Sequence, residues 1–79
     1  MDYEYNVNGN EIKKIMIDKD IKSITEFSRK SGVNRNTLSK VLNNESRPSS
    51  DVMFKIAITL ELTPEMAGTI FFTPNLRNT

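Results

Sequence analysis

The stretch SRKSGVNRNTLSKVLN, residues 28–43, decides how this chain of 79 residues folds. Its two halves carry apolar residues at helical spacing, and Gly32 separates them. Glycine readily adopts the left-handed backbone that ends many helices, so we expect a helix to stop there. Asn34 is a good N-cap for the next helix. The stretch therefore predicts two helices joined by a very short turn.

A turn this short cannot lay two helices antiparallel. It sends the second helix across the first at roughly 90–120°, which is the helix-turn-helix geometry. The second helix opens with Arg35 and Asn36, where core residues could have stood. Because these polar side chains follow the corner, we expect them to face outward and to contact a partner.

Helical spacing and capping residues extend the pattern along the chain, and no run alternates as a strand would. Helices are predicted from Asn8, as N-cap, to about Lys19; over 24–31 after the capping box of Ser23 and Glu26; over 35–43; over 51–60 after Ser50 as N-cap; and from Pro64, after Thr63 as N-cap, to a stop at Pro74. The predicted fold class is all-α: a compact five-helix bundle in a single domain, with an N-terminal arm at 1–7, a helical core at 8–71 and a C-terminal tail at 72–79.

The helical spacing also predicts which side chains are buried. Ile12, Ile15 and Met16 form the inward stripe of the first helix. The core is expected to contain Phe27, Leu38, Val41, Val52, Ile56, Ala57, Leu60 and Met66. Phe71 and Phe72 are adjacent, so they point in different directions on a helix. One of them can complete the core, and the pair is a candidate association surface.

Composition excludes several classes of function. The chain has no cysteine and no histidine, so it lacks thiolate metal sites and imidazole catalysis. We therefore predict no enzymatic activity, no metal and no cofactor. The apolar runs are too short to span a membrane, and the N-terminus does not resemble a secretory signal, which predicts a cytoplasmic protein. Residues 21–48 carry six basic and two acidic side chains between two mildly acidic segments. This basic block suggests a local surface of positive electrostatic potential.

The segment SITEFSRKSGVNRNTLSKVLNNESRPSSDVMFKIAITLELTPEM, residues 23–66, resembles the Cro/C1-type (XRE) helix-turn-helix family of phage repressors and bacterial regulators. Phe27 matches the apolar position of the first motif helix, and Ser28 takes the place of a small residue that is commonly alanine. Gly32 matches the turn. The residues RPS at 47–49 and KIAITLELTPEM at 55–66 resemble the end of the family pattern. The resemblance covers roughly residues 9–70 and implies a lambda-repressor-like bundle.

In that family the first turn of the third helix enters the major groove of DNA. Carried over by position, the resemblance implies base contacts from Arg35, Asn36, Ser39 and Lys40. It implies phosphate contacts from Asn34, Thr37, Asn43 and Arg47, together with the amides that open the second helix.

Two functions follow from the resemblance. The first is a small sequence-specific DNA-binding transcriptional regulator that acts as a homodimer on double-stranded DNA. The alternative is an antirepressor or modulator that uses the same fold to bind a partner repressor protein. Ile24, where relatives often carry a polar residue, favours the alternative, as do Glu45 after the third helix and the acidic start of the chain.

Overall fold

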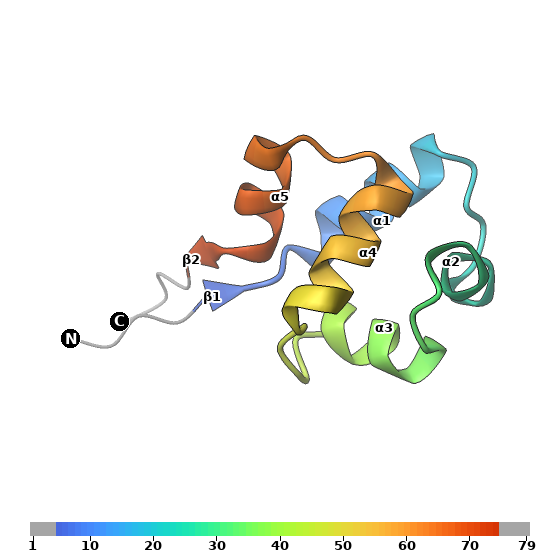
Figure 1. Cartoon of the computed structure of the whole chain (residues 1–79), viewed down its shortest axis with the longest axis horizontal. Helices are drawn as coiled ribbons and strands as arrows, with labels where there is room; N and C mark the ends of the chain where they lie inside the picture. Colours follow the sequence, from blue (N-terminus) through green and yellow to red (C-terminus); the bar gives the residue numbers. More distant parts are fainter. Residues whose placement is uncertain (1–4, 75–79) are drawn as a thin grey trace.

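The computed structural model describes residues 5–74, and most of that span is helical. Figure 1 shows the helices gathered together, with β1 and β2 side by side at one end of the molecule. In chain order the elements are β1 (Tyr5–Asn6), α1 (Gly9–Asp18), α2 (Ile24–Ser31), α3 (Arg35–Leu42), α4 (Ser50–Leu60), α5 (Pro64–Phe71) and β2 (Thr73–Pro74). The all-α, five-helix prediction is confirmed, with one small sheet added.

Side-chain caps fix most of the predicted helix starts. Asn8, Ser23, Asn34 and Thr63 each accept hydrogen bonds from backbone amides in the first turn of the following helix. The prediction was wrong for α4, whose N-cap is Ser49: its hydroxyl accepts from the Val52 amide at 3.2 Å. The extended backbone of Ser49 lets the helix begin one residue earlier, at Ser50.

One hydrogen bond of the α2 capping box differs from the usual pattern, in which the Glu side chain accepts from the amide of the N-cap residue. Ser23 accepts from the Glu26 amide as expected, at 3.1 Å. The Glu26 carboxylate, however, accepts from the amide of Lys22 at 2.8 Å. It therefore ties the cap to the residue before Ser23, and both bonds hold the start of α2 in place.

The core contains most of the side chains that helical spacing predicted. Phe27, Leu38, Val41, Ile56 and Leu60 are buried, as is the predicted inward stripe of α1, while Val52 and Ala57 are partly buried against them. Met66 was predicted to be buried but is 40% exposed. The inward stripe of α5 consists of Ala67, Ile70 and Phe71, at spacings of three and four residues, and Met66 lies off it.

The two strands lie at the ends of the described chain and were not predicted. Tyr5 pairs with Pro74 and Asn6 pairs with Thr73 in an antiparallel ladder. Two-residue strands are too short to show the alternation that marks a strand in sequence. The core also extends into the predicted arm, because Val7 is only 6% exposed.

Two contacts fix the end of α3 against the start of the chain. The Asn44 side chain accepts from the Val7 amide at 2.8 Å and donates to the Val7 carbonyl at 2.9 Å. Asn44 has a φ of 59°, a left-handed conformation that asparagine tolerates. Gly9, the first residue of α1, lies directly against the backbone carbonyl of Leu42. The position of α3 is thus set at its C-terminal end as well as at the turn.

Candidate nucleic-acid interface

The turn between α2 and α3 has the left-handed glycine that the sequence predicted. Gly32 has a φ of 78°, and its amide donates to the Ser28 carbonyl at 2.8 Å. The Ser28 hydroxyl donates to the Val33 carbonyl at 2.6 Å, so serine at the small-residue position also closes the turn. The Val33 side chain is buried, which anchors the corner to the core.

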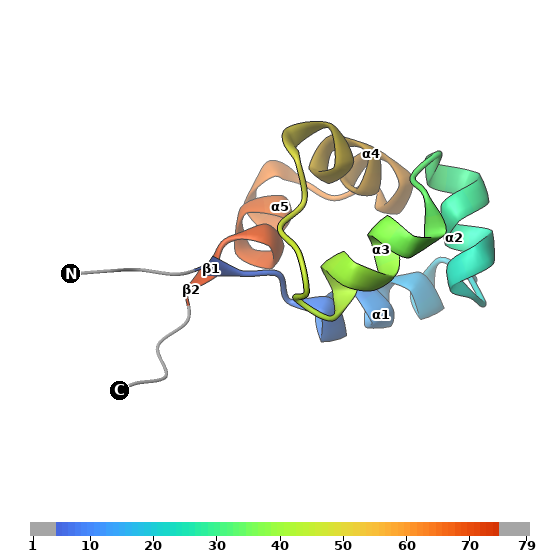
Figure 2. The same ribbon diagram turned by 90° about the horizontal axis from the view of Figure 1, so that it is seen from below.

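The surface of α3 divides into two faces. Leu38, Val41 and Leu42 are buried. Since a helix turns by about 100° per residue, the opposite face carries a row of polar side chains, which we call the α3 stripe. The α3 stripe consists of Arg35, Asn36, Ser39, Lys40 and Asn43, all exposed except for the half-buried Ser39. Figure 2 shows α3 on the face turned to the viewer, with no other element across it.

Arg35 at the start of the α3 stripe is held by α2. Its Nη1 donates to the Oγ1 of Thr25 at 3.1 Å. This bond places the first residue of α3 beside the first turn of α2, whose leading amides have no partner within their own helix. Ile24 is half-buried and packs against the core, so Thr25 presents the polar group at this end of α2. The sequence prediction did not include Thr25.

The predicted phosphate contacts lie in different surroundings. The Oδ1 of Asn34 accepts from the amides of Asn36 and Thr37, which leaves the side-chain nitrogen of Asn34 as a donor. Thr37 is half-buried at the edge of the core. Asn43 is the C-cap of α3 and continues the α3 stripe, so it lies with the predicted base contacts.

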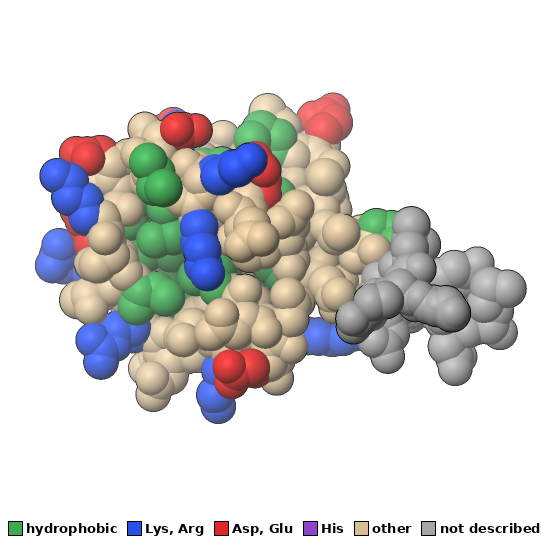
Figure 3. All heavy atoms as spheres, turned by 180° about the vertical axis from the view of Figure 1, so that it is seen from behind, with side chains coloured by type: hydrophobic (Ala, Val, Ile, Leu, Met, Phe, Trp, Pro, Cys, Tyr) green, Lys and Arg blue, Asp and Glu red, His purple; other side chains and the backbone are tan. Residues whose placement is uncertain are grey.

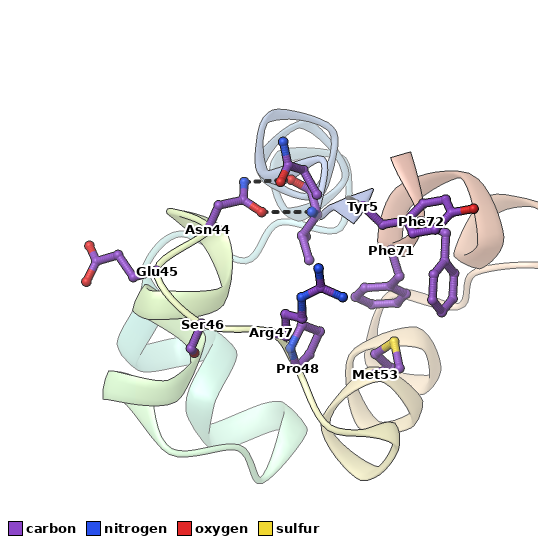
Figure 4. Close-up of a pocket in the computed structure, with 11 residues that line it drawn as sticks. Tyr5, Asn44, Glu45, Ser46, Arg47, Pro48, Met53, Phe71 and Phe72 are labelled. Carbon is purple, nitrogen blue, oxygen red and sulfur yellow. Dashed lines mark hydrogen bonds between the residues drawn. The ribbon is translucent and has the colours of Figure 1, made fainter. Parts of the chain in front are cut away.

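Arg47 is not part of the α3 stripe. Figure 4 shows its side chain pointing into a pocket that lies between the α3–α4 loop and the aromatic residues of β1 and α5. Glu45, two residues earlier in the same loop, points away from the pocket. A phosphate contact from Arg47 would therefore require its side chain to leave the pocket.

Charge on the described part of the chain favours an anionic partner at α3. The ion pairs among residues 5–74 join Lys19 to Glu61, Lys22 to Asp20 and Lys55 to Asp51. No carboxylate among these residues pairs with Arg35 or Lys40 on the α3 stripe. Figure 3 shows the molecule from behind the view of Figure 1. On that face, acidic, basic and hydrophobic side chains are mixed.

The two C-terminal phenylalanines separate as adjacent residues on a helix should. Phe71 is 5% exposed, which corrects its inclusion in the candidate association surface. Phe72 is 51% exposed and contacts Tyr5 edge to face, with ring centroids 5.9 Å apart. The sequence prediction missed Phe54 and Ile58, which are one turn apart on α4 and 66% and 62% exposed. They form a second exposed apolar surface.

These features define a helix-turn-helix domain: a tight turn, a second helix with an uncovered polar face, and caps at both helix starts. Comparison with protein families agrees: the model of the Cro/C1-type HTH DNA-binding domain matches residues 11–65. The chain belongs to this family. Neither a curated protein nor a solved structure matches the chain. Within residues 5–74, no helix is long and apolar enough to cross a bilayer.

Proposed function

We propose that the chain is a small sequence-specific transcriptional regulator that places the α3 stripe in the major groove of operator DNA. The observation that carries this proposal is the hydrogen bond between Arg35 and Thr25. It holds a base-reading cation beside the first turn of α2, where a phosphate would be bound. A helix-turn-helix domain docks on DNA with these two helix ends facing the duplex.

The side chains of the α3 stripe suit the edges of base pairs. Arg35 and Lys40 can donate to the O6 and N7 atoms of guanine. Asn36 can pair with the N6 and N7 atoms of adenine, and Ser39 can contact either kind of base. These four residues span one edge of α3 from its first turn to Lys40, which is the part of the helix that enters the groove.

Phosphate contacts are proposed around this base-reading edge. The leading amides of α2 and the side-chain nitrogen of Asn34 are suitable donors. Thr37 lies in the first turn of α3, and Asn43 is the C-cap at the other end of that helix. Arg47 stays a predicted phosphate contact that depends on a change of its side-chain conformation. Such contacts fix the register of the protein on the duplex, and they make binding sensitive to salt.

We propose that the regulator binds as a homodimer to a pseudo-palindromic site. Its two half-sites would be centred about 34–36 Å apart, one turn of DNA. The exposed Phe72 and the Tyr5 ring beside it supply a candidate association surface at the strand end of the molecule. We propose that the protein acts in the cytoplasm, where it would have access to DNA, and that it needs no cofactor.

Selection of binding sequences from random duplex DNA at low salt tests the proposal. The Arg35→Ala/Lys40→Ala variant is run in parallel, and circular dichroism confirms that it folds. A half-site that is enriched by the native chain and lost in the variant is the expected result, and a repeat of that half-site one turn away identifies the dimer. Equal binding of all sequences by both proteins would refute base reading by α3.

A second candidate function is an antirepressor that binds a partner repressor protein. The exposed apolar residues Phe54 and Ile58 favour it, because exposed apolar patches mark association surfaces. Glu45 also favours it, since a carboxylate after α3 would repel phosphate. This candidate is supported if the native chain enriches no sequence and shows no binding at low salt. Any enriched sequence that requires the α3 stripe rejects it as the main function.

A further inference from the structure

A pocket lies at the strand end of the molecule, between β1, the α3–α4 loop and the C-terminal end of α5. Its volume is about 380 Å³, within the range of small-molecule sites. The buried faces of Val7 and Phe71 contribute apolar surface to it. The other side chains on which the argument depends are Tyr5, Arg47, Met53 and Phe72. Figure 4 shows them arranged around the opening.

Two charged residues line this pocket, the cation Arg47 and the carboxylate Glu45. The Arg47 guanidinium points into the pocket toward Phe71, whereas the carboxylate of Glu45 is directed away from it. The amide of Asn44 is already committed to both backbone groups of Val7. Among residues 5–74, no carboxylate forms an ion pair with Arg47.

We propose that this pocket binds a small carboxylate with an apolar body. A guanidinium presents parallel N–H groups that match the two oxygens of a carboxylate. A single cation suits a monoanion better than a phosphate dianion. The rings of Phe71 and Phe72 and the thioether of Met53 then cover the apolar part of the ligand, which a bare inorganic anion would leave unfilled.

The pocket is separate from the α3 stripe, so this inference does not rest on DNA binding. The pocket and the proposed DNA surface have one residue in common, because Arg47 is also a predicted phosphate contact. A ligand that holds Arg47 inward would remove it from DNA. The loop that carries Arg47 begins directly after α3, and Asn44 ties it to the N-terminal segment. A bound carboxylate would therefore bridge both segments and the end of α5.

The probe for the experiment is 4-phenylbutyrate, titrated without DNA into the full chain labelled with ¹⁵N. The neutral amide 4-phenylbutanamide and inorganic phosphate are titrated separately. We expect saturable shifts of the Arg47 Nε–H and of the Val7 and Phe72 amides with the acid. The amide should bind about tenfold more weakly or worse, because it lacks the charge-assisted bond. Phosphate should not saturate these signals over the same range.

Two variants locate the site. Arg47→Gln should weaken binding of 4-phenylbutyrate by about tenfold or more, whereas Arg29→Gln, which removes the same charge from α2, should leave the affinity within about twofold. Phe72→Ser should also weaken binding. Because Phe72 is exposed, its replacement should leave the domain folded, which a melting curve checks. Equal affinity for acid and amide, an unchanged affinity in Arg47→Gln, or equally tight binding of phosphate would each overturn the proposal.

Discussion

Replacing Gly9 by alanine tests how closely α1 and α3 must approach. A Cβ atom on Gly9 would lie 2.3 Å from the backbone oxygen of Leu42 and 3.2 Å from its carbonyl carbon. Both neighbours are backbone atoms, so no side-chain rotation can relieve the overlap. The start of α1 and the end of α3 would have to separate until the 2.3 Å contact reached at least 3.4 Å, where ordinary van der Waals contact begins.

The energetic cost follows from where this separation occurs. Leu42 is buried, as is Ile12 one turn into α1, so moving the two helices apart loosens the core between them. Forcing an extra carbon into a packed site of this kind costs about 1–3 kcal/mol of unfolding free energy. For a domain of this size, that corresponds to a decrease in Tm of roughly 5–20 °C.

Gly68 on α5 supplies a matched control. It is exposed, and a Cβ placed on it would meet nothing within 4 Å. Alanine is favoured over glycine inside a helix by about 0.5–1 kcal/mol, so Gly68→Ala should raise Tm by a few degrees. Urea and thermal unfolding followed by circular dichroism measure both variants. If Gly9→Ala were as stable as the native chain or more stable, the close approach would be refuted.

Three further perturbations test individual contacts. Thr25→Val removes the hydroxyl that holds Arg35. Selection from random DNA should then show a weaker preference at one base position, with little change in Tm. An unchanged preference would contradict the role of Thr25 in positioning Arg35. Asn44→Gly keeps the left-handed backbone but deletes two hydrogen bonds, and should lower the free energy of unfolding in urea by about 1–3 kcal/mol; no loss would mean that water replaces both bonds. Glu61 has a pKa lowered first by its hydrogen bond from Lys19 and then by the charge of that ammonium, with burial opposing slightly. A lowered pKa stabilises the fold above the unfolded-state value near 4.5, so the stability advantage over Glu61→Gln should decline as the pH falls from that value through the lower folded-state pKa; an advantage that persists below both pKa values contradicts this.

Local signals made the helices predictable. Asn8, Ser23 and Thr63 each mark a helix start because a short polar side chain can satisfy an open amide of the first turn. Gly32 marks the corner because its φ of 78° is strained for other residues. These signals act within four residues along the chain, so the sequence alone contains them. The motif then follows, since a short corner restricts how two helices can cross.

Contacts between distant segments were not predictable in this way. The bonds from Asn44 to Val7 join residues 37 positions apart, and an asparagine in a loop is equally consistent with a simple turn. The exposure of Met66 depends on which side of α5 meets α1, a property that helical spacing alone leaves open. Arg47 is a similar case, because its position next to the helix-turn-helix suggested DNA, while its direction depends on β1 and α5.

The start of α2 shows why matching by position can give the wrong polar group. The family pattern aligns Ile24 with a residue that often contacts phosphate, and an isoleucine there suggested weak binding to DNA. A single step along a helix turns the side chain by about 100°, so neighbouring residues face different surroundings. Here Ile24 packs against the core and Thr25 turns its hydroxyl to Arg35. Thr25 thus supplies a polar group one residue after Ile24, and we therefore expect Ile24 to weigh little against DNA binding.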